Sequence, residues 1–169
     1  MYKKISLYIL ITLIISCSSS WRSFTSAGGR FSVLLPDIPK EEDIVVQTDF
    51  GPVAMHIFSI INLRRAVSYT IIYGDYPAQI TSAAPEVILE QEVKQILSDV
   101  SQDKARQKDI MISGKAGKEV IMHNDNGETI YVRLCVVKNT LYKILATVSD
   151  EKKHRKDIDT FLNSFRIQP

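Results

Sequence analysis

The stretch that decides the fold is Ile130-Tyr-Val-Arg-Leu-Cys-Val-Val137, then Lys138-Asn-Thr140 and Leu141-Tyr-Lys-Ile-Leu-Ala-Thr-Val148. β-branched and aromatic residues on either side of a short polar turn predict two neighbouring antiparallel strands. Alternate side chains of a strand face opposite sides, and here both sets are almost wholly apolar, with Arg133 the only charged residue of the first strand. An antiparallel sheet with one face in water would instead alternate apolar and polar residues. We therefore expect a sheet that is covered on both faces.

The rest of the chain supplies further strands and two helices. Similar runs bounded by Gly, Pro, Asn and Asp predict strands at 31–35, 43–48, 53–60, 66–73, 106–112 and 117–123. Apolar residues at helical spacing predict a helix over 83–101, with Ser82 as its cap and Pro85 in its first turn, and a second over 150–164. Asn126-Gly127 predicts a type I′ hairpin turn, and we expect Gly114 and Gly117 to be turn or bulge positions. The fold class is α+β, a largely antiparallel sheet with helices packed on it.

The N-terminus has the features of an export signal. Met1-Tyr-Lys-Lys4 is followed by the mainly apolar run from Ile5 to Ile15, which is too short to span a bilayer. Ile14-Ile15-Ser16-Cys17 resembles the bacterial lipobox, which implies cleavage between Ser16 and Cys17 and lipidation of Cys17. An ordinary signal peptide cleaved elsewhere, or an uncleaved anchor, are the alternatives.

This N-terminus also sets the expected organisation and location. Residues 1–16 would be a lipoprotein signal peptide, 17–29 the lipidated cysteine and a flexible tether rich in Ser and Gly, and 30–169 a single domain. The partner implied is a membrane, held through the lipid anchor at Cys17. Because Ser18 is not Asp, we expect the outer membrane of the bacterial envelope, with the domain facing the periplasm.

Composition excludes some classes of function. Lys3 and Lys4 are two of the 21 Lys and Arg residues, which leaves 19 against 19 Asp and Glu residues after cleavage. A chain without net positive charge lacks the electrostatic footprint of a nucleic-acid-binding protein. With Cys17 acylated, Cys135 has no partner for an intramolecular disulfide. We expect Cys135 to be a buried small hydrophobe, because nothing nearby in the sequence would activate it as a nucleophile.

The order of landmarks along the chain is similar to that of a known family. The landmarks are Gly29-Arg30-Phe31-Ser32-Val33, Tyr73-Gly74-Asp75-Tyr76-Pro77, Gly114-x-x-Gly117-Lys118-Glu119, Tyr131-x-Arg133, Leu141-Tyr142-Lys143 and Phe161-Leu162-Asn163-Ser164-Phe165. Over 21–167 they resemble the PsbP/DcrB-like family of small exported α/β/α domains, many of them bacterial lipoproteins. The resemblance implies an α/β/α sandwich and a role in binding or assembly. It implies no shared reaction, and no family site residue maps onto this chain.

No cluster of residues predicts catalysis. His56, His123 and His154 form no closely spaced ligand pair. His123, Asp125 and Glu128 lie within one hairpin and could hold a metal, but Asp125-Asn126-Gly127 is also what a tight turn requires. The acids Glu90, Glu92, Asp157 and Asp159 are expected to be surface charges. The basic run from Lys152 to Lys156 could contact anionic headgroups, or could be the solvated face of a helix balanced by its own acids.

The sequence therefore predicts a non-enzymatic envelope lipoprotein without a cofactor or structural metal, which binds or assembles with an unidentified envelope protein. An exposed apolar or aromatic patch would support this hypothesis. The alternative is an envelope carrier of a small ligand or metal, with a pocket near Tyr73, Asp75 and Tyr76. Trp21 could fold back onto the domain or lie at the membrane interface.

Overall fold

Seven antiparallel strands form the main sheet of the computed structural model, which describes residues 21–48, 51–76, 84–98 and 104–169. The strand order is β3-β4-β5-β9-β8-β7-β6. Their bounds are β3 (Lys40–Thr48), β4 (Gly51–Asn62), β5 (Val67–Asp75), β6 (Ala105–Ile112), β7 (Lys115–His123), β8 (Thr129–Val137) and β9 (Thr140–Val148). A smaller sheet holds β1 (Arg22–Ser26), β2 (Phe31–Leu35) and β10 (Arg166–Ile167) in the order β1-β2-β10. The predicted α+β class is confirmed.

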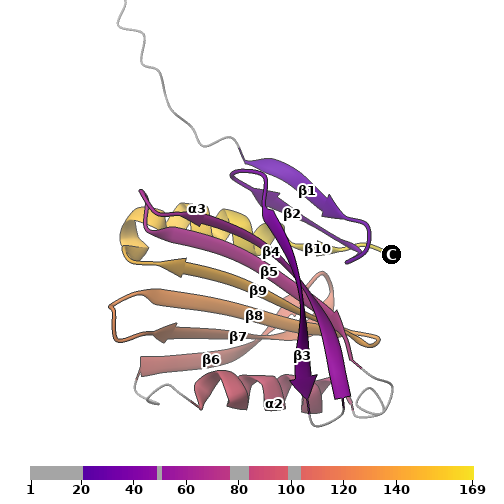
Figure 1. Cartoon of the computed structure of the whole chain (residues 1–169). Helices are drawn as coiled ribbons and strands as arrows, with labels where there is room; N and C mark the ends of the chain where they lie inside the picture. Colours follow the sequence, from indigo (N-terminus) through magenta and orange to yellow (C-terminus); the bar gives the residue numbers. More distant parts are fainter. Residues whose placement is uncertain (1–20, 49–50, 77–83, 99–103) are drawn as a thin grey trace, which may run out of the picture.

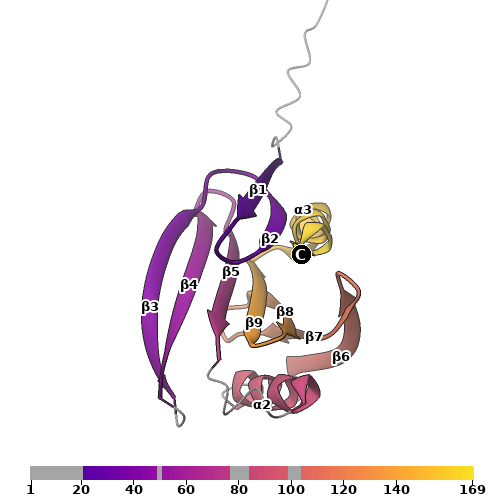
Figure 2. The same cartoon turned by 90° about the vertical axis from the view of Figure 1, so that its right-hand side faces the viewer.

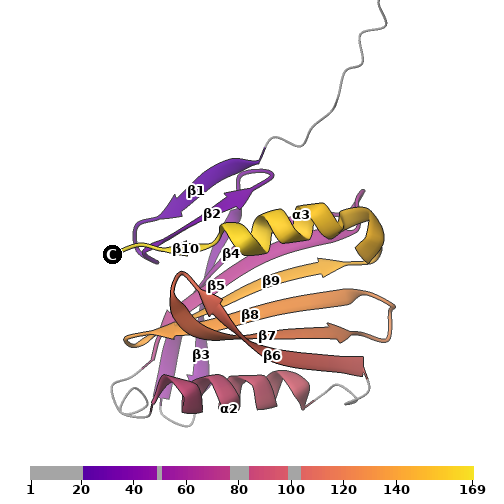
Figure 3. The ribbon, with the colours of Figure 1, turned by 180° about the vertical axis from the view of Figure 1, so that it is seen from behind.

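The central strands of the main sheet are covered on both faces, as the sequences of β8 and β9 predict. Helix α3 (Glu151–Ser164) and the small sheet lie on one face, and helix α2 (Pro85–Leu97) lies on the other (Figures 1 and 3). The two sets of β8 side chains enter two separate cores. Tyr131, Cys135 and Val137 pack on the α3 side, and Ile130, Val132, Leu134 and Val136 pack on the α2 side.

Both helices form near their predicted positions. In α3 the Asp150 side chain accepts a hydrogen bond from Lys153 N at 3.1 Å, which caps the first turn. The predicted buried residues of this helix are confirmed: Ile158, Phe161, Leu162 and Phe165. In α2 Pro85 occupies the first turn, where its missing N–H costs nothing, and the N-cap residue is Ala84. The predicted cap Ser82 lies outside the described residues.

A two-residue hairpin turn of type I′ occurs at Ser113-Gly114, and not at the predicted Asn126-Gly127. A type I′ turn needs positive φ at both central residues, and Ser113 and Gly114 have φ of 50° and 75°. At the predicted site only Gly127 has positive φ, because the β7–β8 loop runs from Asn124 to Glu128 and is closed by Asn124. Gly117 is in neither a turn nor a bulge. It lies within β7 and pairs directly with Ile110 and Cys135.

The folded domain begins earlier than predicted. Residues 21–29 do not belong to a tether, because Arg22–Ser26 form β1 and pair with β2. Trp21 also packs edge-on against Tyr69, with ring centroids 5.5 Å apart. Residues 21–29 therefore belong to the domain, in addition to the predicted 30–169. The signal peptide, Ser16, Cys17 and the first part of the tether lie outside the described residues.

Candidate functional site

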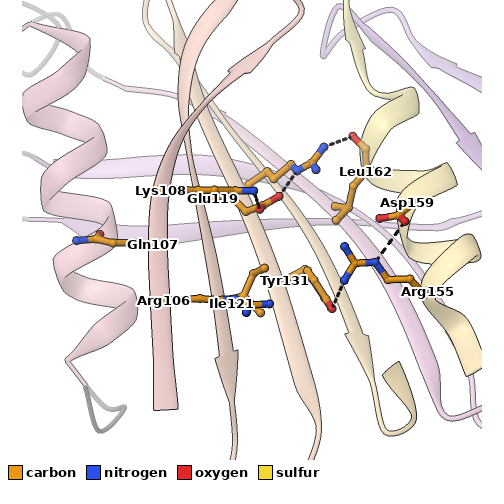
Figure 4. A pocket seen from close by; sticks show the side chains of 10 residues that line it. Arg106, Gln107, Lys108, Glu119, Ile121, Tyr131, Arg155, Asp159 and Leu162 are labelled. Carbon is orange, nitrogen blue, oxygen red and sulfur yellow. Dashed lines mark hydrogen bonds and ion pairs between the residues drawn. The ribbon is translucent and has the colours of Figure 1, made fainter. Parts of the chain in front are cut away.

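A cleft of about 350 Å³ lies between α3 and the β6–β7–β8 part of the sheet (Figure 4). Four cations and two carboxylates line it, together with a tyrosine and two aliphatic side chains. The lining residues are Arg106, Gln107, Lys108, Glu119, Ile121, Tyr131, Arg133, Arg155, Asp159 and Leu162. The volume lies in the range of small-molecule pockets.

Strand register builds the floor of this cleft. Lys108 pairs with Glu119, and Glu119 pairs with Arg133, so these three side chains form one row across β6, β7 and β8. Arg106, Ile121 and Tyr131 form the next row in the same way. Directly opposite residues of neighbouring strands have Cβ atoms about 5 Å apart. The pairing alone therefore brings a cation, a carboxylate and a second cation into line.

Glu119 is the buried centre of the first row, with only 4% of its surface exposed. Its carboxylate contacts Lys108 Nζ at 2.8 Å and Arg133 Nε at 2.7 Å. Burial raises the pKa of Glu119, but the hydrogen bonds from Lys108 and Arg133 outweigh it, and the pKa lies below its usual value. Arg133 Nη1 also donates to Leu162 O at 2.9 Å, at the C-terminal end of α3. This row joins the sheet to the helix.

A second network forms the other wall. The Tyr131 hydroxyl donates a hydrogen bond to Glu151, which also accepts one from Arg155 Nη1 at 3.0 Å. Arg155 Nε lies 3.3 Å from Asp159 Oδ2 (Figure 4). Burial, and then the hydrogen bond to Glu151, raise the pKa of Tyr131 to about 12. The hydrogen bond from Tyr131 is the main cause of the lowered pKa of Glu151.

Arg106 is the cation that these networks leave available. It is exposed at the mouth of the cleft, and it makes no hydrogen bond or ion pair within the described part of the chain. Its charge acts only at longer range, lowering the pKa of Tyr131 and Glu151. Four cations and two carboxylates line the cleft, and the carboxylate of Glu151 pairs with Arg155 beside it, so the cleft has an excess of one positive charge. It therefore favours an anionic group, which a guanidinium can bind through two parallel hydrogen bonds.

Three ionisable groups of this region have pKa values displaced away from neutral pH. The pKa of Tyr131 is raised to about 12, and the pKa values of Glu119 and Glu151 lie below their usual value. An efficient general acid or base needs a pKa near the working pH. The cations of the cleft can bind and orient an anion, and none of these three groups is tuned for acid–base chemistry near neutral pH.

The predicted metal candidates are not brought together. His123 Nδ1 lies 3.1 Å from Thr129 Oγ1, Asp125 pairs with Lys104 at 2.7 Å, and Glu128 accepts a hydrogen bond from Asn124 at 2.8 Å. No group of three His, Cys, Asp or Glu residues that could hold a metal occurs among the described residues. The hairpin therefore follows the tight-turn interpretation.

The other two histidines occupy different environments. His56 stacks on Tyr73, with ring centroids 4.6 Å apart, and its Nδ1 lies 2.6 Å from Asp43 Oδ1. His154 is buried on the inner side of α3, and its Nδ1 lies 3.6 Å from Asp157 Oδ2. Neither histidine reaches the cleft.

Among the described residues, the three side chains of the predicted ligand pocket have separate partners. Tyr73 lines a separate hollow beside His56, while Asp75 accepts a hydrogen bond from Thr140 at 2.5 Å. The Tyr76 hydroxyl donates to Glu92 at 2.5 Å, and Lys143 Nζ lies 2.5 Å from the same carboxylate. The prediction that Glu92 is a surface charge is therefore wrong, since it is 7% exposed and held between these two partners.

Cys135 is a buried residue of the α3-side core, as predicted. Burial raises the pKa of its thiol to about 12. Of the residues that line the cleft, Arg133 stands out in the sequence, because it is the only charged residue of an otherwise apolar strand. Its partner Glu119 and the exposed Arg106 carried no such signal, since they reach the site through strand pairing.

Comparison with known proteins shows that the fold of this chain occurs in solved structures. No family model matches the chain, and no curated protein sequence matches it. The solution structure of cyanobacterial PsbP (CyanoP) from Synechocystis sp. PCC 6803 superposes with a TM-score of 0.56, over 88% of this chain and 93% of that one, at 13% sequence identity. The protein has a PsbP-like fold.

A second solved structure agrees with this fold. A protein from Bacteroides thetaiotaomicron superposes with a TM-score of 0.50, at 14% identity, over 88% of this chain. The match spans about half of the Bacteroides protein, 49% of its length. The predicted resemblance is thus confirmed at the level of the fold.

Proposed function

We propose that this protein is a non-catalytic binding module, anchored in the bacterial envelope through an acylated Cys17. Its domain holds an envelope protein partner by an acidic group seated in the cleft between α3 and β6–β8. The observation that carries the proposal is the charge of that cleft: each carboxylate is already paired, and Arg106 is left without a short-range partner among the described residues.

The chemistry of the cleft favours an acidic partner. A carboxylate side chain or a chain terminus fits beside Arg106, with Tyr131 and Leu162 as apolar walls. Hydrogen bonds to charged groups contribute about 1.5–3 kcal/mol, so this contact would supply a large share of the affinity. The displacement of the pKa values of Glu119, Tyr131 and Glu151 away from neutral pH supports binding over catalysis.

The anchor at Cys17 rests on the sequence. Within the described residues no helix is both long enough and apolar enough to span a membrane. Intact-mass and peptide mass spectrometry of the protein purified from membranes tests the anchor, and we expect the mature chain to begin at acylated Cys17. An unmodified Cys17, or a mature chain that begins elsewhere, contradicts it.

Crosslinking in cells tests the binding role. We expect the full chain to capture a reproducible envelope protein, and Arg106→Gln to weaken the capture about 10- to 100-fold, as the loss of a charge-assisted contact implies. Lys94→Gln removes an exposed charge from α2, on the opposite face of the sheet, and should leave the capture unchanged. Equal losses in both variants would contradict a role for the cleft.

The carrier hypothesis remains the second candidate, because the cleft volume of about 350 Å³ suits a small ligand. Native mass spectrometry separates the two. A retained small anion that Arg106→Gln abolishes, with no captured protein, would favour a carrier.

A further inference from the structure

Helix α3 presents three lysines on its outward face. Lys152, Lys153 and Lys156 are all exposed, whereas His154, Ile158, Phe161 and Leu162 face the core. None of the three makes an ion pair within the described part of the chain. Two of them lie in the first turn, where the helix dipole disfavours positive charge. The helix dipole therefore does not explain the two lysines of the first turn.

The acids of the same helix do not neutralise this face. Asp157 pairs with Arg65 of the β4–β5 turn at 2.7 Å, and Asp159 and Glu151 both pair with Arg155. Asp150 caps the helix N-terminus. The expected balance between the acids of the helix and its basic run is therefore met at Arg155, which pairs with Glu151 and Asp159, while none of the three lysines pairs directly with an acid of the helix.

The β4–β5 turn, which carries exposed apolar and basic side chains, contacts α3. Its Arg65 forms an ion pair with Asp157 of the helix, and Ser149 N, two residues before the helix, donates to Ala66 O at 3.2 Å. Leu63 in this turn is 87% exposed, and the exposed Arg64 is its neighbour in the chain. A protruding apolar turn flanked by cations suits a membrane interface.

The chain enters the domain at this same side. Trp21 packs on Tyr69, and Tyr69 in turn packs on Phe161 of α3, with ring centroids 5.0 Å apart. Figures 1 and 2 show β1, where the described chain begins, on the side of α3 and away from α2. Cys17 precedes Trp21 by four residues, which span at most about 14 Å when extended. An acyl group on Cys17 would thus hold this side of the domain close to the bilayer.

We propose that Lys152, Lys153, Lys156, Arg64 and Leu63, here called the α3 face, dock on a bilayer surface that contains anionic phospholipids. The lysines and Arg64 contact phosphate groups while Leu63 enters the interface. In this orientation the cleft between α3 and β6–β8 opens to the side, parallel to the membrane. Helix α2 and the edge strand β6 face away from the membrane. The orientation rests on the proposed anchor at Cys17, whereas the lipid affinity of the face does not.

Vesicle sedimentation of the unacylated chain from Cys17 to Pro169, which keeps the whole domain from Trp21 onward, tests this affinity without the anchor. The vesicles contain phosphatidylglycerol and phosphatidylcholine, or phosphatidylcholine alone. We expect binding only to the former, and a loss of about 100-fold in partitioning when Lys152, Lys153 and Lys156 are all changed to Gln, at about 1 kcal/mol per basic residue. Leu63→Gln should weaken partitioning about tenfold, from the transfer of one leucine side chain.

A matched variant controls for net charge. Lys94→Gln, Lys115→Gln and Lys138→Gln together remove the same charge from exposed positions outside the α3 face, and should leave partitioning unchanged. Equal losses in the two triple variants, or no loss in the first, overturn the proposal. The sedimentation assay uses unacylated protein. If Cys17 proved to be unmodified in cells, the proposed anchor would be wrong, but the measured affinity of the α3 face for vesicles would stay the same.

Amine-reactive labelling of the membrane-bound acylated protein tests the orientation. We expect Lys152, Lys153 and Lys156 to be protected several-fold in anionic vesicles relative to detergent, with Lys94, Lys115 and Lys138 labelled equally in both. Protection of the second set in place of the first would overturn the orientation.

Discussion

Arg133 joins Glu119 to the end of α3: its Nε lies 2.7 Å from Glu119 Oε2, and its Nη1 donates to Leu162 O at 2.9 Å. The arginine therefore satisfies a carboxylate that is 4% exposed and a carbonyl at the helix C-terminus. Replacing Arg133 should lower the free energy of unfolding more than removing an exposed charge does, because Glu119 stays buried with only part of its counter-charge.

Arg133→Met should lower the free energy of unfolding by about 2–3 kcal/mol, less than the 3–5 kcal/mol of a fully orphaned buried charge, since Lys108 still pairs with Glu119. Denaturant unfolding measures it. The double variant Glu119→Gln with Arg133→Met should recover part of the loss, and Arg106→Gln should change stability by less than about 0.5 kcal/mol. A double variant less stable than Arg133→Met alone would contradict this interpretation.

Stability should fall in acid. Glu119 and Glu151 have pKa values below the ordinary value of 4.5, so the folded state binds fewer protons than the unfolded state. Their contribution is complete above the unfolded pKa and is lost as pH falls through the folded values. We expect a denaturant midpoint that declines below about pH 4.5, and a shallower decline in Glu119→Gln. The exposed Asp37→Asn should keep the wild-type profile.

Gly117→Ala should destabilise the protein by about 1–3 kcal/mol through overpacking. A Cβ at this position would lie 2.5 Å from Leu134 O and 3.1 Å from Ile112 Cδ1. Gly114 has φ of 75° and open space around it, and Asn adopts such a conformation readily. Gly114→Asn should therefore cost at most about 1 kcal/mol. Thermal unfolding compares the two, and equal losses would show that packing at Gly117 is looser than described.

Phe24 tests the revised domain boundary. It packs on Phe58 and Phe31, with ring centroids 5.2 and 6.2 Å apart. Phe24→Ala should cost about 2–3 kcal/mol, somewhat less than a fully buried phenylalanine. The exposed Thr25→Ala on the same strand is the control. If Phe24→Ala were neutral in chemical denaturation, residues 21–29 would behave as the tether that the sequence alone suggested.

Cys135 should be inert in the native protein, because it is fully buried and its thiol pKa is raised to about 12. In a Cys17→Ser background it is the only cysteine. Its reaction with a thiol reagent should occur only through unfolding and should accelerate with denaturant. Rapid labelling without denaturant would contradict the described core.

Local patterns predicted most of the elements, for a simple reason. The apolar runs of Thr129–Val137 and Thr140–Val148 and the helical spacing of Ile158, Phe161, Leu162 and Phe165 are local patterns, and they are confirmed. The predictions were wrong where the structure of a residue depends on contacts with residues far away in the sequence. Arg22–Ser26 look like a linker until β2 pairs with them, and Glu92 looks solvated until Tyr76 and Lys143 converge on it.

The sequence by itself determined the α+β class and the sheet whose central strands are apolar on both faces, because periodicity and local composition need no long-range information. The export signal with Cys17 is a prediction from the sequence. Only the tertiary structure decided which charges meet. Register across β6, β7 and β8 aligned Lys108, Glu119 and Arg133 and left Arg106 at the mouth of the cleft. Because the β4–β5 turn packs on α3, Asp157 forms its ion pair with Arg65 and not with a lysine of the helix. Such pairings depend on contacts between residues far apart in the chain, which no local pattern encodes.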